Sequence, residues 1–267
     1  MGLGVFLLIN FVFIFVVMYI AQKTRFKPID GYNKLKLAED IPYYRDIPNI
    51  SIEEAYFLGY LYGLVQNPSD LIGAMLLKWV KEEKIFLKRD GDKVVVDMNK
   101  AVKFTNRYES KIYFKLLASS GSNFILEEAE FINFFKSKAI VKLLRNMLVE
   151  TERYFIVNGL FRKDAFGAEY KYYLDDSLKE KAYQMAGLKK FLLDFSNIDI
   201  KSSQEVVLWE DYLIYAQLMG IADKVEEQFA KLYPNYNHFI EYSIIRSALL
   251  VSLANSLRFL PFLFISR

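Results

Sequence analysis

The sequence predicts a mainly α-helical protein with small β-hairpins, an α+β fold, behind an N-terminal transmembrane helix. Three observations lead to this prediction. The first residues form an apolar run without a charge, Ser-x-x-Glu signals stand before segments of helical period, and two helical segments give way to short β-rich runs around a turn. The expected architecture is a membrane anchor, one or two winged-helix-like modules and a C-terminal helical bundle.

The composition indicates a folded chain and excludes several kinds of catalytic and metal-binding chemistry. Of the 267 residues, 53% are hydrophobic and 25% are charged, which excludes a disordered chain. The absence of cysteine excludes disulfides, thiolate catalysis and cysteine metal sites. The single histidine, His238, has no acid close by in sequence to orient it, and zinc sites built from several histidines are excluded. We therefore expect no catalytic residue, no metal and no cofactor.

Residues 1–22 are predicted to span a membrane. No charge occurs from Met1 to Ala21, and about twenty helical residues at about 1.5 Å each cross a hydrocarbon layer of roughly 30 Å. A secretory signal peptide would carry a basic start and a small-residue cleavage site, and neither is present. Three cations follow the run: Lys23, Arg25 and Lys27. The positive-inside rule therefore predicts a single-pass protein of the cell membrane, with its N-terminus outside and the bulk of the chain cytoplasmic.

Residues 23–50 are expected to be an extended linker laid against the next domain, because prolines interrupt every regular period. Residues 51–104 read as a winged-helix-like module. A capping box at Ser51–Glu54 opens a helix to about Leu64, a second helix follows through residues 72–83, and a hairpin centres on Asp90–Gly91. Gly59 and Gly63 lie in surroundings too polar for a membrane span, which indicates close helix packing.

Residues 105–175 repeat this order more loosely, as a second, degenerate winged-helix-like module. Helices are expected at 108–120 and between 127 and 158, followed by a degenerate hairpin up to 174. Residues 176–242 form the helical segment, in which capping boxes at Ser177–Glu180 and Ser202–Glu205 open two helices.

The apolar C-terminal segment, residues 243–267, has about the length of a membrane span. Arg258 lies inside it and Pro261 breaks it. An amphipathic helix that lies on the inner membrane face, or packs on the domain, is therefore favoured over a second span.

Many winged helices bind nucleic acid, so we consider whether the charge of this module would allow it. The second helix and the hairpin of the first module carry cations interleaved with Glu82, Glu83, Asp90 and Asp92. Binding through phosphates needs several uncompensated cations, and a net charge of +3 is too small to supply them elsewhere. Contact with a protein is favoured over nucleic acid, and the candidate interaction residues are Lys78, Lys81, Lys88, Arg89 and Lys93.

The segment 207–225 is predicted to be a helix that is buried nearly all round, with a narrow polar strip of Glu210, Asp211 and Gln217. Adjacent carboxylates point about 100° apart on a helix, so Glu210 and Asp211 do not form the facing pair that hydrolysis requires. Gly220 indicates where this helix ends.

The same segment carries a resemblance to a known family. FLLDFSNID at 191–199 and LWEDYLIYAQLMGIADKV at 208–225 resemble a signature of the YciQ-like predicted membrane proteins, a family of unknown function. YRDIPN at 44–49 resembles the start of that family's cytoplasmic region. The likeness covers residues 43–234. Residues expected to have a structural role in the signature are Phe195, Leu208, Trp209, Glu210, Tyr212, Leu213, Tyr215, Ala216 and Gly220.

The chain also departs from that family's pattern. Met219 stands where an aliphatic residue is usual, and the sequence begins at the apolar run, where members of that family are expected to carry an extracytoplasmic β domain first. A shortened relative or a partial chain is therefore expected. The role of that outer domain is therefore not carried over.

The leading hypothesis is a non-enzymatic, membrane-anchored cytoplasmic module that docks an unknown protein partner, with self-association as a further option. The alternative is a membrane-tethered DNA-binding transcription regulator, which a steep dependence of duplex affinity on salt would reveal. An enzyme that uses carboxylates and tyrosines is a third reading, and it would need a cleft gathering acids of raised pKa.

Overall fold

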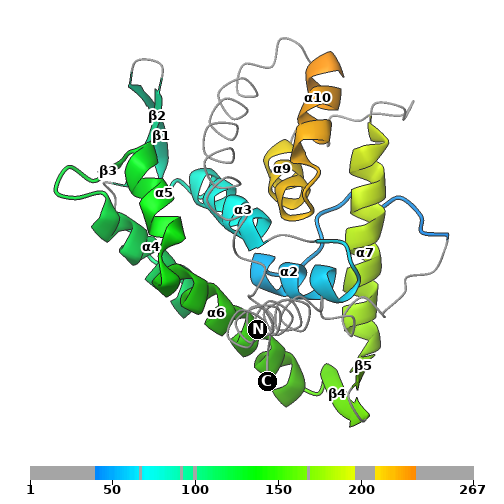
Figure 1. Ribbon diagram of the computed structural model, residues 1–267. Helices are drawn as coiled ribbons and strands as arrows, with labels where there is room; N and C mark the ends of the chain where they lie inside the picture. Colours follow the sequence, from blue (N-terminus) through cyan, green and yellow to red (C-terminus); the bar gives the residue numbers. More distant parts are fainter. Residues whose placement is uncertain are drawn as a thin grey trace, which may run out of the picture.

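The computed structural model describes residues 40–65, 68–90, 93–98, 101–166, 169–195 and 208–232. Within these ranges the chain is mainly helical with small antiparallel sheets, as predicted (Figure 1). The helices are α2 (Ile52–Leu61), α3 (Pro68–Lys81), α4 (Arg107–Ser119), α5 (Glu128–Lys136), α6 (Lys138–Val157), α7 (Asp176–Leu193), α9 (Trp209–Leu218) and α10 (Ala222–Leu232). The strands are β1 (Phe86–Asp90), β2 (Lys93–Asp97), β3 (Ile125–Leu126), β4 (Phe161–Phe166) and β5 (Glu169–Leu174).

None of the helices in these ranges is long and apolar enough to cross a membrane. The predicted anchor at residues 1–22, His238 and the C-terminal segment 243–267 lie outside the described residues.

The first predicted capping box is confirmed and the second is wrong. Ser51 accepts a hydrogen bond from the backbone of Glu54, and the Glu54 side chain accepts one from the backbone of Ser51, which opens α2. On α7 the cap is Asp175, whose carboxylate accepts the backbone N–H of Ser177 at 2.9 Å. An aspartate two positions earlier reaches the free N–H groups first, so Ser177 lies inside the helix. The box predicted at Ser202–Glu205 lies outside the described residues.

The first hairpin is confirmed, and it gains a strand that the sequence did not predict. β1 and β2 pair from Phe86↔Asp97 to Asp90↔Lys93, which brackets residues 91–92, one position later than the predicted centre. β3 adds to β2 through Val96↔Leu126 and Asp97↔Ile125. Two residues are too few to show a period of two, so no sequence pattern indicated this strand.

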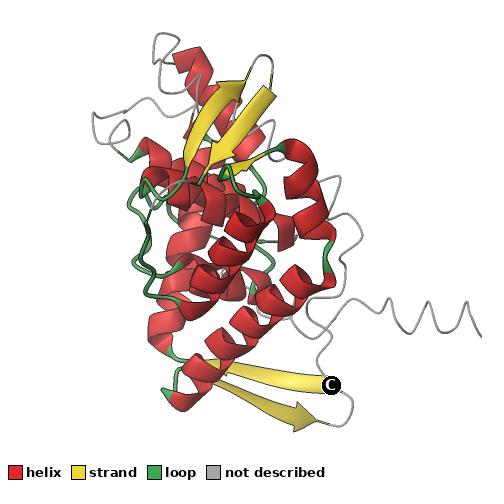
Figure 2. Cartoon of the chain, turned by 90° about the vertical axis from the view of Figure 1, so that its left-hand side faces the viewer, coloured by secondary structure: helices red, strands yellow, loops and turns green. Residues whose placement is uncertain are grey.

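The second hairpin is regular rather than degenerate. β4 and β5 pair through six consecutive positions, from Phe161↔Leu174 to Phe166↔Glu169. Phe161 and Tyr172 stack with ring centroids 5.9 Å apart and are both buried, so one face of the hairpin contributes to the core. The hairpin extends beyond the helices at the bottom of Figure 2.

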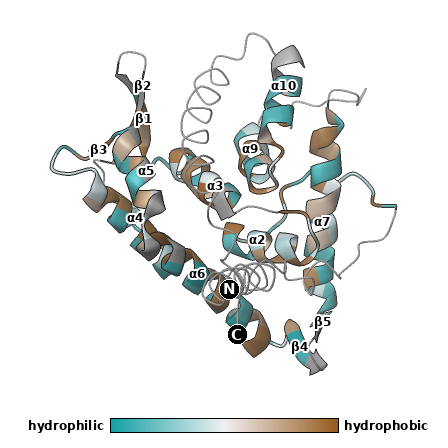
Figure 3. Cartoon of the chain, in the orientation of Figure 1, coloured by the Kyte–Doolittle hydropathy of each residue, from teal (hydrophilic) through white to brown (hydrophobic). Residues whose placement is uncertain are grey.

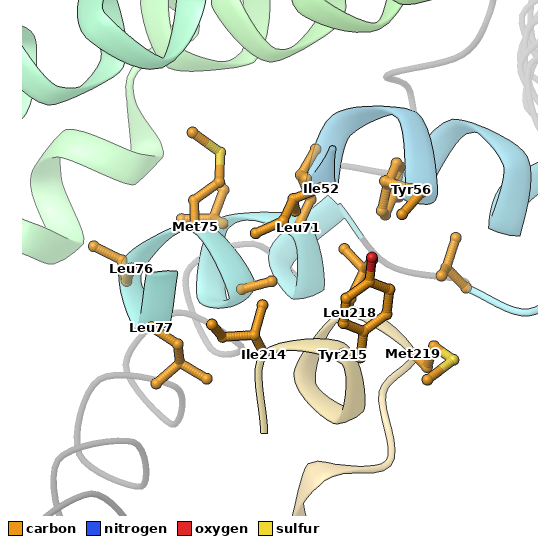
Figure 4. Close-up of a cluster of buried hydrophobic side chains, with 14 of the residues drawn as sticks. Ile52, Tyr56, Leu71, Met75, Leu76, Leu77, Ile214, Tyr215, Leu218 and Met219 are labelled. Carbon is orange, nitrogen blue, oxygen red and sulfur yellow. The ribbon is translucent and has the colours of Figure 1, made fainter. Parts of the chain in front are cut away.

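One continuous apolar core joins all parts of the described chain. α3 packs most extensively against α9, and α2 contacts α3, α6 and α7. Figure 4 shows this junction, where α2, α3 and α9 contribute Tyr56, Leu71, Met75, Tyr215 and Leu218. Helices far apart in sequence therefore share one interior, and α3, which precedes the first hairpin, packs directly on α9.

Two predictions for α9 and α2 can be checked in this core. α9 is buried nearly all round as expected, but Gln217 is only 5% exposed and lies beside Asp70, with its Nε2 3.5 Å from Oδ1. Its place on a solvated polar strip was therefore wrong, because α3 covers that side of the helix. Close packing at Gly59 is confirmed, since an added Cβ would lie 2.8 Å from Val65 Cγ1 and 3.2 Å from Met185 Cε. At Gly63 the same prediction is wrong, because this residue is exposed, with φ +68, beyond the end of α2.

Candidate interaction site

Residues 40–50, which we call the strap, lie across α7 and α9. The hydroxyl of Tyr212 donates a hydrogen bond to the carbonyl of Arg45 at 2.6 Å, and the hydroxyl of Tyr215 donates to that of Pro48 at 3.0 Å. The two hydroxyls thus supply hydrogen-bond donors to strap carbonyls that are not paired in a β-sheet. The two sequence motifs that resemble the YciQ-like family, at 44–49 and 208–222, therefore contact each other.

α7 fixes the other side of the strap. Lys190 Nζ donates to the carbonyl of Ile41 at 2.9 Å, and the Tyr43 hydroxyl donates to Asp194 Oδ2 at 3.0 Å. This hydrogen bond raises the pKa of Tyr43, to which burial and the charge of Asp194 add. The guanidinium of Arg45 lies 5.5 Å from the centre of the Phe191 ring.

The strap passes so close to α7 that no side chain fits between them at Gly187. A Cβ at this position would lie 2.6 Å from the carbonyl oxygen of Pro42 and 2.9 Å from Cβ of Tyr44. The linker was expected to lie against the next domain in sequence. Its described part, residues 40–50, also contacts helices more than a hundred residues further along, with separations of 149 to 167.

A cavity of about 590 Å³ opens where the strap, α3, α9 and the start of α4 meet. Six charged side chains line it, four acidic and two basic. They are Glu53, Lys78, Lys81, Glu82, Glu109 and Asp211.

Glu109 is the buried centre of this charged group. It is 6% exposed, and its Oε1 accepts from Trp79 Nε1 at 2.6 Å and from Lys78 Nζ at 2.8 Å. Glu82 lies 3.4 Å from the same ammonium group. Burial by itself lowers the pKa of Lys78, but the hydrogen bond and charge of Glu109, with Glu82, outweigh it and raise the pKa above its usual value.

Two more of the candidate cations also have carboxylate partners. Lys81 Nζ lies 2.5 Å from Asp211 Oδ2, which ties α3 to α9. Lys88 on β1 pairs with Asp97 on β2. The side chains of Arg89 and Lys93 lie outside the part of the chain that can be described, although their backbones pair with Val94 and Asp90 in the hairpin.

The signature residues divide into core and cap positions. Leu208 is half-buried, Glu210 is exposed, and Gly220 has φ +67 directly after α9, a conformation that glycine adopts without strain. The remaining signature residues are buried: Phe195, Trp209, Tyr212, Leu213, Tyr215 and Ala216.

Sequence reasoning did not single out several residues that build the site. Glu109 on α4 and Tyr43, Lys190 and Asp194 around the strap have no local pattern that distinguishes them from ordinary surface residues. Only the partner of each residue distinguishes it, and this partner lies in a distant part of the sequence.

Comparison with known families finds a match that includes α7 and α9, the two helices that contact the strap. Residues 154–229 match the family described as "Predicted membrane protein (DUF2207) C-terminal domain". The match confirms the predicted resemblance to a membrane protein family of unknown function and supports association of the chain with a membrane. The DUF2207 segment runs from the end of α6 into α10, so both strap-binding tyrosines belong to it. No curated protein and no solved structure matches the chain.

Replacing Tyr215 in the DUF2207 segment by phenylalanine should lower the free energy of unfolding by about 1 kcal/mol at neutral pH, because the carbonyl of Pro48 loses its donor. Burial, and then the charges of Asp211, Glu54 and Tyr44, raise the pKa of Tyr215. The unfolded chain loses this proton from about pH 10 upward while the folded chain keeps it. Stability should therefore fall above pH 10 more steeply in the wild type than in Tyr215→Phe, as urea unfolding at several pH values would measure.

Proposed function

We propose that this chain is a non-enzymatic docking module, held at a membrane, that binds a protein partner at the charged cavity between the strap, α3 and α9. The observation that carries the proposal is the internal pairing of the candidate cations. Lys78, Lys81 and Lys88 each have a carboxylate partner within the fold. The surface around the cavity thus combines both signs of charge with a recess, which suits polar contacts to another protein.

The same pairing argues against a phosphate backbone as the ligand. A cation already bound to a carboxylate would have to give up this partner before it could neutralise a phosphate, and only uncompensated cations release counterions on binding. The cavity itself has four acidic side chains against two basic ones. Nucleic acid would meet repulsion at this site.

The proposal is tested by site-specific photocrosslinking of the full-length chain in native membranes. A photoreactive amino acid at Thr105 or Asn49, which line the cavity and are exposed, should give one discrete adduct with another protein. The matched control is the same amino acid at Tyr183 on α7, also exposed and outside the cavity. Glu82→Lys, a charge reversal at the rim, should abolish the adduct at Thr105. Equal adducts at the cavity and control positions would contradict the proposal.

A membrane-tethered DNA-binding regulator is the rival function, favoured by the order helix, helix, hairpin in α2, α3, β1 and β2. We expect duplex affinity to be weak, with a salt dependence equivalent to about one or two phosphates at most. Fluorescence anisotropy with a labelled duplex at several salt concentrations measures this slope. A dependence equivalent to about six or more phosphates would overturn the docking proposal in favour of DNA.

A further inference from the structure

The outward face of α6 carries a second surface, separate from the cavity. The interior side of this helix contributes Ile140, Leu144, Met147 and Phe155 to the core. At about 100° per residue, the side chains opposite them fall within about 80° of the helix circumference and extend over about 21 Å. We call this the α6 strip; its members are exposed, and they are Lys142, Arg145, Val149, Arg153 and Ile156.

The α6 strip combines cations with large apolar side chains. Val149 is 49% exposed and Ile156 is 42% exposed, and Val157 beside them is 75% exposed. α6 forms the lower left edge of the molecule, and both hydrophilic and hydrophobic positions occur along it (Figure 1, Figure 3). These β-branched apolar residues give the exposed face of α6 an apolar component beside its cations.

Two acidic residues of this part of α6 border the strip, and each has contacts with another part of the fold. Glu152, on one flank, accepts a hydrogen bond from Lys163 of β4 at 2.6 Å. Glu150, on the other flank, lines a cavity of about 320 Å³ shared with α2 and α4. Lys142 and Arg153 are the cations on which a contact outside the fold rests, because Arg145 also interacts within it.

We infer that the α6 strip lies against the headgroup region of an anionic membrane. Cations that alternate with valine and isoleucine on one exposed helix face suit a bilayer surface, where the apolar groups enter the boundary and the cations meet lipid phosphates and carboxylates. A second copy of the chain fits less well, because two such strips facing each other bring cation against cation. The match to a predicted membrane protein family begins at Tyr154 on the same helix.

This contact is independent of the docking proposal, since the strip and the charged cavity share no residue. A membrane contact here would fix how the described part of the chain is oriented on the bilayer. Failure of one proposal leaves the other unaffected.

The absence of cysteine makes a direct test available. A single Ile156→Cys change allows an environment-sensitive fluorophore to be attached at the strip in the full-length chain, reconstituted into vesicles of phosphatidylcholine with or without phosphatidylserine. In vesicles with phosphatidylserine, quencher-bearing lipids should quench this label and aqueous iodide should not. The control label at Tyr183→Cys, at an exposed position of α7 outside the strip, should show the opposite pattern.

The charge dependence gives a second readout. Each cation near an anionic surface contributes about fivefold to the equilibrium between the docked and free states. Lys142→Gln with Arg153→Gln should therefore reduce docking roughly 25-fold, and vesicles without phosphatidylserine should behave similarly. Both side chains are exposed, so the thermal unfolding curve should be unchanged. The inference is overturned if the labels at 156 and 183 respond equally in anionic vesicles, or if labels at 156 on two copies approach each other whatever the lipid charge.

Discussion

Replacing Glu109 by alanine is expected to lower the free energy of unfolding by about 3 kcal/mol, the largest single effect among the polar residues of the charged cavity. The change leaves the indole N–H of Trp79 and the ammonium group of Lys78 without their shared acceptor. Breaking a fully buried pair costs about 3–5 kcal/mol, and the lower end applies here because the Lys78 side chain is 29% exposed. Urea unfolding followed by far-UV circular dichroism measures the difference.

The pH dependence of this variant provides an internal check. The pKa of Lys78 is raised in the folded chain, so its contribution is fully present below about pH 10.5 and is lost as the pH rises further. Glu109→Ala should remove this alkaline loss. The matched control is the double change Lys78→Met and Glu109→Leu, which removes both charges and should cost less than Glu109→Ala. A single variant as stable as the wild type would show that the pair contributes nothing.

Substituting leucine for Gly187 should release the strap from α7 and lower the free energy of unfolding by about 2–3 kcal/mol. A glycine inside a helix normally becomes more favourable when replaced, by up to about 1 kcal/mol for alanine. Here the first carbon of any side chain would meet the carbonyl of Pro42 at 2.6 Å, so the strap has to move. That movement also removes the bonds from Lys190 to Ile41 and from Tyr212 to Arg45.

Limited proteolysis followed by mass spectrometry detects strap release, as faster cleavage after Arg45. Gly187→Ala should show the same effect in weaker form, because its Cβ alone makes the contact. Lys179→Ala, which removes only a surface ion pair between Lys179 and Asp176 on α7, is the control and should leave both stability and cleavage near the wild-type values. Unchanged cleavage in Gly187→Leu would mean that the strap does not depend on its contact with α7.

The elements that could be predicted are those whose cause is local. The Ser51 capping box lies within four residues, the hairpin at 86–97 lies within twelve, and the burial of α9 follows from apolar side chains on nearly every face. Gly220 was expected to end α9, and its positive φ is the conformation that glycine favours. The error at Ser177 is local as well, since two capping residues competed and the aspartate prevailed.

The candidate cations show where sequence reasoning ended. The sequence placed Lys78 and Lys81 on the polar side of a helix and favoured a protein partner because acidic residues interleave with them. The fold gives them Glu109, 31 positions from Lys78, and Asp211 on α9 as partners. These ion pairs determine whether a lysine is available to a ligand or is bound to a carboxylate of the same fold. The sequence pattern of a single helix does not indicate such a pair, because the partner is on another helix.

The sequence by itself determined a mainly helical chain, most of its helix and hairpin positions, and a resemblance to a membrane protein family. Only the tertiary structure decided that the strap lies on α7 and α9, that β3 completes the first sheet, and that the charged cavity forms where these parts meet. The physical reason is separation along the chain. Capping and periodicity act over a few residues, whereas Tyr212 and Arg45 are 167 positions apart and meet only because burial of a shared core brings them together.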